Sequence, residues 1–191
     1  MAFNLISRLV NSAKGAVTAS LKGTADVASS VVDVVKNTTI STLKETSEFV
    51  KEGLDVPASI VKGALTGVGE IGASVISAVK GVVKGAVQGF MESGGEQKEA
   101  VQGAVAQAIR SAKELGLDIG ETAVAAVRGS VEAVIQVGGD AATATKEAVT
   151  AAINAAKEVG GDAVVTVRES LKNGIQGAKE IIEAARKTPE K

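Results

Sequence analysis

The residue types that most often carry enzyme chemistry are scarce in this sequence. The 191 residues include no His, Cys, Trp or Tyr and only three Phe, so the chain has no imidazole base and no thiolate nucleophile. It also lacks aromatic platforms for stacking bases, and 21 basic against 22 acidic residues leave a net charge of −1. We therefore expect neither an enzyme, nor a metal or covalent cofactor, nor a nucleic-acid-binding protein.

One segment has the glycine spacing of a phosphate-binding loop. Gly67-Val68-Gly69-Glu70-Ile71-Gly72 matches the fingerprint of dinucleotide-binding folds, and Glu92 follows 20 residues after Gly72. The fingerprint requires a preceding strand and a parallel βαβ unit, and the surrounding sequence shows neither pattern. We interpret these glycines instead as part of a helical repeat.

This repeat has a period of 22 residues and sets the positions of all other features. From Leu9 to Ala184 it runs through eight blocks without insertion or deletion. The ninth position is aliphatic in seven blocks, the thirteenth is aliphatic in all eight, and the eighteenth is acidic in seven. We expect the acidic positions to form a solvated stripe beside Lys and Arg. The predicted apolar stripe contains Val61, Leu65, Val83, Val87, Val105, Ile109, Val127, Val131, Val149, Ile153, Leu171 and Ile175.

The period predicts an all-α fold. Apolar or small residues recur at spacings of three and four that make two eleven-residue units, and eleven residues in three turns keep the stripe on one helix face. Because block length is constant, we expect long amphipathic helices that run through several blocks. A single block buries too little apolar surface to offset the ordering of its backbone. We therefore predict packing as an oligomeric helical bundle or tube.

Glycines mark the possible breaks between helices. Gly53-Leu54-Asp55 with Pro57, and the segment 93–96, combine a glycine stop with an acidic residue that could cap the next helix, and we expect turns at both. The same pattern at Gly116, Gly138 and Gly160 is compatible with a turn or kink, or with a glycine buried at a close helix crossing. The resulting division is a helix over 1–22, Gly-rich repeats over 23–95, repeats with breaks over 96–187 and a tail over 188–191.

Other glycines are spaced to lie on one helix face. Gly81, Gly85 and Gly89 recur every four residues, and Gly63 and Gly67 repeat the spacing upstream. Such a glycine zipper allows two helix backbones to approach closely. We expect these five glycines to form close helix contacts within or between chains, the alternative being a permissive helix without a dedicated partner.

The first 22 residues are amphipathic, with no acidic residue before Asp26. An apolar face beside a basic face suits the surface of an anionic membrane, and the alternative is a helix docked on its own protein. No signal sequence or transmembrane span is expected, which predicts a cytoplasmic protein peripheral to the inner face of a membrane. The candidate membrane-surface residues are Phe3, Leu5, Ile6, Leu9, Val10, Arg8, Lys14 and Lys22.

The gapless periodicity and segments such as Val82–Val87 resemble the amphipathic eleven-residue families, namely synucleins, perilipins, exchangeable apolipoproteins, phasins and late-embryogenesis proteins. The invariant synuclein core and the acidic tail are absent. The Ala, Val and Gly content, the basic N-terminus and repeats such as Ala126-Val127-Arg128-Gly129 are also similar to the helical stalk subunit of high-affinity, quinone-reducing nickel–iron hydrogenases. That resemblance implies a membrane-associated tube with an apolar lumen.

These observations predict a non-catalytic scaffold. We expect a homo-oligomer that associates with a membrane surface, anchors a partner complex such as a hydrogenase, and could enclose an apolar conduit for lipophilic quinone or lipid. The alternatives are a lipid-surface coat protein and a desiccation-type protectant.

Overall fold

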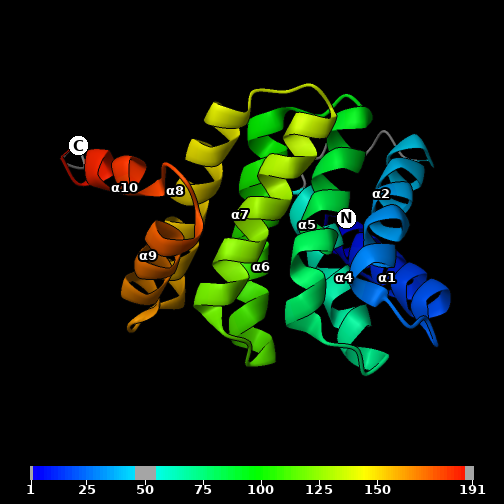
Figure 1. Cartoon of the computed structure of the whole chain (residues 1–191). Helices are drawn as coiled ribbons and strands as arrows, with labels where there is room; N and C mark the ends of the chain where they lie inside the picture. The colour runs from blue at the N-terminus through cyan, green and yellow to red at the C-terminus, as the bar shows by residue number, and fades with distance from the viewer. Residues whose placement is uncertain (1, 46–54, 188–191) are drawn as a thin grey trace.

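The computed structural model describes residues 2–45 and 55–187, and within these ranges all regular structure is α-helical (Figure 1). The absence of strands from the described residues confirms the all-α prediction. The helices are α1 (Ala2–Leu21), α2 (Val27–Glu45), α4 (Val56–Glu70), α5 (Val75–Glu92), α6 (Gln97–Leu115), α7 (Ile119–Gln136), α8 (Ala141–Val159), α9 (Ala163–Gly174) and α10 (Ala178–Lys187). None of these helices combines the length and apolarity needed to span a membrane.

The helices form two layers. One layer contains α1, α4, α6 and α8 in that order, and the other contains α2, α5, α7 and α9, each helix packing against the next in its layer (Figure 1). The chain from α4 onward alternates between layers, and α10 closes the end of the array against α8 and α9. Repeated helical pairs therefore stack along one direction, as in helical-repeat proteins.

The glycine breaks are turns at which the chain reverses direction. Gly94, Gly116, Gly138 and Gly160 have φ values of 91°, 68°, 78° and 82°, in the left-handed region that glycine adopts without a Cβ penalty. The turn predicted near 93–96 is therefore confirmed, whereas the one near 53–57 is described only from Asp55 onward. Five successive helices begin 22 residues apart, at Val75, Gln97, Ile119, Ala141 and Ala163.

The prediction that helices run through several blocks is wrong. The described helices span 10 to 20 residues, so from Val75 to Gly174 a block holds one helix and one turn. Constant block length has a different physical cause from the one we expected. Every turn must return the next helix to the same height in the stack, and an insertion would shift its contacts with both neighbours.

Aspartate side chains next to the turns cap the helices that follow. The carboxylates of Asp55, Asp118 and Asp140 each accept a hydrogen bond from the backbone amide three residues later, at 3.0, 2.7 and 2.6 Å. Such caps satisfy amides that have no partner inside the helix. Two further turns, at Gly23 and Gly72, have φ values of 83° and 74°, and neither was predicted as a turn from the sequence.

The predicted apolar stripe lies between the two layers. The six stripe members at the ninth block position are fully buried, and they are Val61, Val83, Val105, Val127, Val149 and Leu171. Leu65, Val87, Ile109 and Ile153 are also buried, whereas Val131 and Ile175 are only partly buried at the edge of this core. Because the turns fold the blocks onto one another, one chain covers its own stripe, and the oligomeric bundle or tube stays a prediction.

Candidate functional site

The glycines of α4 lie against the backbone of α1. A Cβ added to Gly67 would lie 2.9 Å from the carbonyl oxygen of Lys14, and one added to Gly63 would overlap the carbonyl oxygen of Val10. Both helices advance four residues between the two contacts, so they run parallel and in register. The packing is close enough that no side chain fits between the helices at these positions.

The glycines of α5 make the same contact with α2. Added Cβ atoms at Gly81, Gly85 and Gly89 would lie 2.8, 2.5 and 2.7 Å from three carbonyl oxygens of α2. Those oxygens belong to Ala28, Val32 and Lys36. The five predicted glycines thus all lie at helix contacts inside one chain, where glycine Cα–H groups can approach carbonyl oxygens.

Further close contacts involve glycines that the sequence analysis did not identify. Gly129 of α7 lies against the Lys80 carbonyl of α5, and Gly120 of α7 lies against Ser170 of α9. Gly129 and Gly120 are not spaced four residues apart, so no zipper pattern marks them. Only the position of the neighbouring helix shows whether a glycine is needed for a close contact or could be replaced by a larger residue.

The acidic eighteenth position forms ion pairs between neighbouring helices of a layer. Its members Glu70, Glu92, Glu114 and Glu158 accept from cations at 2.7, 2.9, 3.4 and 2.7 Å. The cations are Lys14, Lys36, Lys62 and Arg110. We call this series the ion-pair ladder. Its side chains are 28 to 58% exposed, so each pair contributes only about 0.2–1 kcal/mol to stability.

The ladder has one direction along the array. In every pair the cation comes from the earlier helix and the acid from the later one. Between α5 and α7 the acid is Glu132, which lies 2.5 Å from Lys80 and 3.6 Å from Lys84. Between α7 and α9, Arg128 donates to the carbonyl oxygen of Gly174 at 2.9 Å. The acidic stripe is therefore partly exposed and lies beside Lys and Arg, as expected, and it also links neighbouring helices of a layer.

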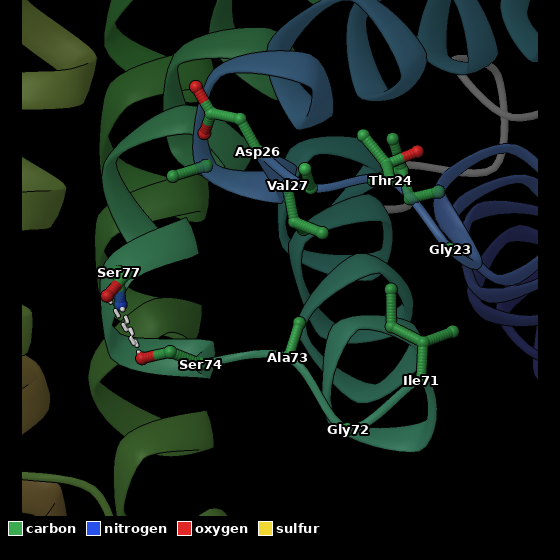
Figure 2. Close-up of a pocket in the computed structure, with 12 residues that line it drawn as sticks. Gly23, Thr24, Asp26, Val27, Ile71, Gly72, Ala73, Ser74 and Ser77 are labelled. Atoms are coloured by element: carbon green, nitrogen blue, oxygen red, sulfur yellow. Dashed lines mark hydrogen bonds between the residues drawn. The ribbon is translucent and has the colours of Figure 1, made fainter.

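A pocket of about 480 Å³ lies where the turns at Gly23 and Gly72 meet the starts of α2 and α5 (Figure 2). One amide at each helix start already has a side-chain partner, because Ser74 accepts from the amide of Ser77 and Asp26 accepts from the amide of Ser29. Hydrogen bonds from the Ser29 side chain and amide lower the pKa of Asp26, and no cation lines the pocket. The pocket has no nucleophile–base pair and no positive charge for an anion.

One glycine of the dinucleotide-like segment, Gly72, lines this pocket, and the segment does not form a nucleotide site. Gly67 and Gly69 lie within α4, and Gly72 lies in the turn that follows. A helix, not a strand, therefore precedes the turn, and Glu92 is used in an ion pair with Lys36. This geometry agrees with our interpretation that the segment belongs to the helical repeat.

The N-terminal helix directs most of its apolar face inward. Leu9 is fully buried, Leu5 and Val10 are partly buried, and Ile6 is 40% exposed. The side chain of Phe3 lies outside the described residues. Of the three predicted cations, Lys14 is paired with Glu70, whereas Arg8 and Lys22 are exposed. The packing follows the docked-helix alternative, and lipid contact through Leu9 would require α1 to leave α4.

Asp55, which caps α4, and Glu99 in the first turn of α6 both have raised pKa values. Desolvation raises the pKa of Asp55, against the opposing effects of the Ala58 amide and the Arg110 charge. Desolvation and the nearby Asp55 and Glu96 charges raise the pKa of Glu99. Within residues 2–45 and 55–187, no group of acidic side chains is arranged to hold a metal ion.

Comparison with known proteins identifies the architecture. No protein-family model matches the chain, and no curated protein matches it significantly. Among solved structures, the chain is similar to the crystal structure of the de novo designed helical repeat protein DHR7, with 20% identity and a TM-score of 0.55. The similarity covers 98% of each chain. At this identity the likeness concerns the fold, which is that of a helical-repeat protein.

Proposed function

We propose that the protein is a non-catalytic helical-repeat scaffold that presents a rigid two-layer surface to a partner. The observation that carries this proposal is the repeated pairing of neighbouring helices. Glycine–carbonyl contacts set the spacing of α1 with α4 and of α2 with α5, and ion pairs join successive helices from α1 to α8 in one layer and from α2 to α7 in the other. The charged side chains of these pairs therefore link neighbouring helices, and the glycines allow the helix backbones to approach closely.

Peripheral association with a membrane remains part of the proposal, through the exposed side of α1. Ile6, Arg8 and Lys22 are the members of the predicted set that the fold leaves accessible. The packing gives no support to a quinone conduit or to a hydrogenase partner, because the stripe that would line a lumen is enclosed between the layers of one chain. A lipid-surface coat would likewise require these layers to open.

Two variants distinguish a folded scaffold from a coat protein or protectant that orders only on lipid or on drying. Val105 is fully buried and Ile135 is 57% exposed, so Val105→Asp and Ile135→Asp place the same charge inside and outside the core. In lipid-free buffer, circular dichroism should show a helical wild type with cooperative unfolding. Val105→Asp should abolish that transition and Ile135→Asp should retain it, because an unpaired buried charge is strongly destabilising.

A chain that is disordered in buffer and becomes helical only with vesicles would refute the scaffold proposal. Equal behaviour of the two variants would refute it as well, since a chain without a core would not distinguish the two positions.

A further inference from the structure

Helix α9, the last helix of the second layer, carries the same pattern of residues as the surface of α5 that contacts α7. Arg168 and Lys172 lie 88 residues after Lys80 and Lys84, and the flanking sequences Val167-Arg168 and Leu171-Lys172 match Val79-Lys80 and Val83-Lys84. On α5, the two cations hold Glu132 of α7 at 2.5 and 3.6 Å.

A small residue of α7 completes this contact. Gly129, three positions before Glu132, lies against the backbone carbonyl of Lys80. A Cβ added there would overlap this carbonyl oxygen, so the close approach in this chain requires glycine. The surface of α5 is thus matched to a helix with a small residue followed three positions later by an acid.

Helix α10 also packs against α9, but among the described residues no acid of α10 or of any other helix forms an ion pair with the same surface of α9. Val165, Arg168 and Lys172 are spaced at i, i+3 and i+7, which places them on one helix face. We call these three residues the α9 edge. Val165 is 56% exposed, and Lys172 is exposed and forms no ion pair within the described part of the chain. The Nε atom of Arg168 is enclosed by protein and has no hydrogen-bond partner there.

The polar contacts between successive helices of the second layer all have the same direction, from a cation on the earlier helix to an acceptor on the later one. At the earlier steps of the layer, Lys36 meets Glu92, Lys80 and Lys84 meet Glu132, and Arg128 meets the Gly174 carbonyl. In this layer the earlier helix supplies the cation and the later helix supplies the acceptor, so Arg168 and Lys172 of α9 would pair with an acceptor on a helix after α9. Helices α9 and α10 form the end of the array (Figure 1). An acceptor for these two cations would therefore come from another helix placed beside α9.

We propose that the α9 edge docks a helix of a partner protein that carries a small residue followed three positions later by Asp or Glu. This inference rests on the proposed scaffold function and names its partner surface. A second copy of the chain fits less well. In α2, the first helix of the layer, the 22-residue spacing places Lys44 where α7 has Glu132, so stacking in register would bring a third cation to Arg168 and Lys172.

A synthetic peptide of residues 119–136 is the probe, because it is the α7 sequence that carries Gly129 and Glu132. Its affinity for the full chain is measured by fluorescence anisotropy at low and high salt. We expect binding that weakens with salt and that becomes about tenfold weaker or more with Arg168→Glu and Lys172→Glu together. A peptide with Glu132→Lys should recover binding to that variant. Lys98→Glu with Lys146→Glu, two exposed cations elsewhere, is the control with the same change in net charge.

The proposal is overturned if the folded chain does not bind the peptide, or if the control reversal weakens binding as much as reversal at the α9 edge. It is also overturned if light scattering shows an oligomer that only the edge reversal dissociates, which would make a second copy the occupant. These outcomes leave the scaffold proposal intact, since a chain helical in lipid-free buffer satisfies it. A chain without helix in that buffer removes the scaffold proposal itself.

Discussion

Replacing Gly85 by alanine tests whether the glycine contacts stabilise the fold. The added Cβ would lie 2.5 Å from the Val32 carbonyl oxygen and 3.0 Å from the Lys36 backbone nitrogen. Carbon–oxygen contacts between helices are normally about 3.3 Å or longer, so α2 and α5 would have to separate by roughly 0.8 Å. Gly81 and Gly89 share the same face, so this separation would loosen their contacts too.

Two opposing effects determine the sign of the change. Alanine is better than glycine in a helix interior by about 1 kcal/mol, whereas forced overpacking costs about 1–3 kcal/mol. Because the clash involves backbone that cannot rotate away, we expect the upper part of that range. Gly85→Ala should therefore lower the free energy of unfolding by about 1–2 kcal/mol.

Gly15→Ala is the matched control. Gly15 lies within α1, is exposed, and has no atom within 4 Å of an added Cβ. Only the gain in helix propensity applies there, so stability should rise by up to about 1 kcal/mol. Urea unfolding followed by circular dichroism would compare the midpoints, and an unchanged denaturant slope would attribute the shift to stability. If Gly85→Ala stabilised the protein as Gly15→Ala does, the close-packing argument would be refuted.

Three further predictions concern charged residues. Glu132→Gln should lower the urea midpoint by an amount equivalent to about 0.5–1 kcal/mol at low salt and by less at high salt, because its two ion pairs are partly exposed. The raised pKa of Asp55 means that the free energy of unfolding falls as pH rises from the unfolded-state value of 3.8 to the folded-state pKa. Asp55→Asn should remove this pH dependence in thermal melts and lower the pKa of Glu99 measured by NMR, and an unchanged Glu99 titration would contradict the proposed coupling. Arg8→Glu with Lys22→Glu should reduce flotation with anionic vesicles without altering the melting temperature, whereas unchanged flotation would exclude these cations as the membrane contact.

The local patterns of the sequence correctly identified the helical class and most of the buried face. Helical periodicity depends only on residues three and four apart, so the ninth block position could be assigned to a core without knowledge of any neighbour. The stripe residues from Val61 to Leu171 at that position are all fully buried. The glycine spacing of α5 was equally readable, because residues four apart share a face whatever that face contacts.

Which surface covers each face depended on the tertiary structure. Gly116, Gly138 and Gly160 allow a kink or a reversal, and the reversal forms because the next helix then packs on the existing layer. The partners in the ion-pair ladder are about 50 residues apart, such as Lys62 with Glu114, so no local pattern could match them. The same physical limit applies to α1, whose apolar face suits lipid and protein alike. Only the position of α4 shows that Leu9 is buried inside the chain, because hydrophobic burial is non-directional and does not specify the covering surface.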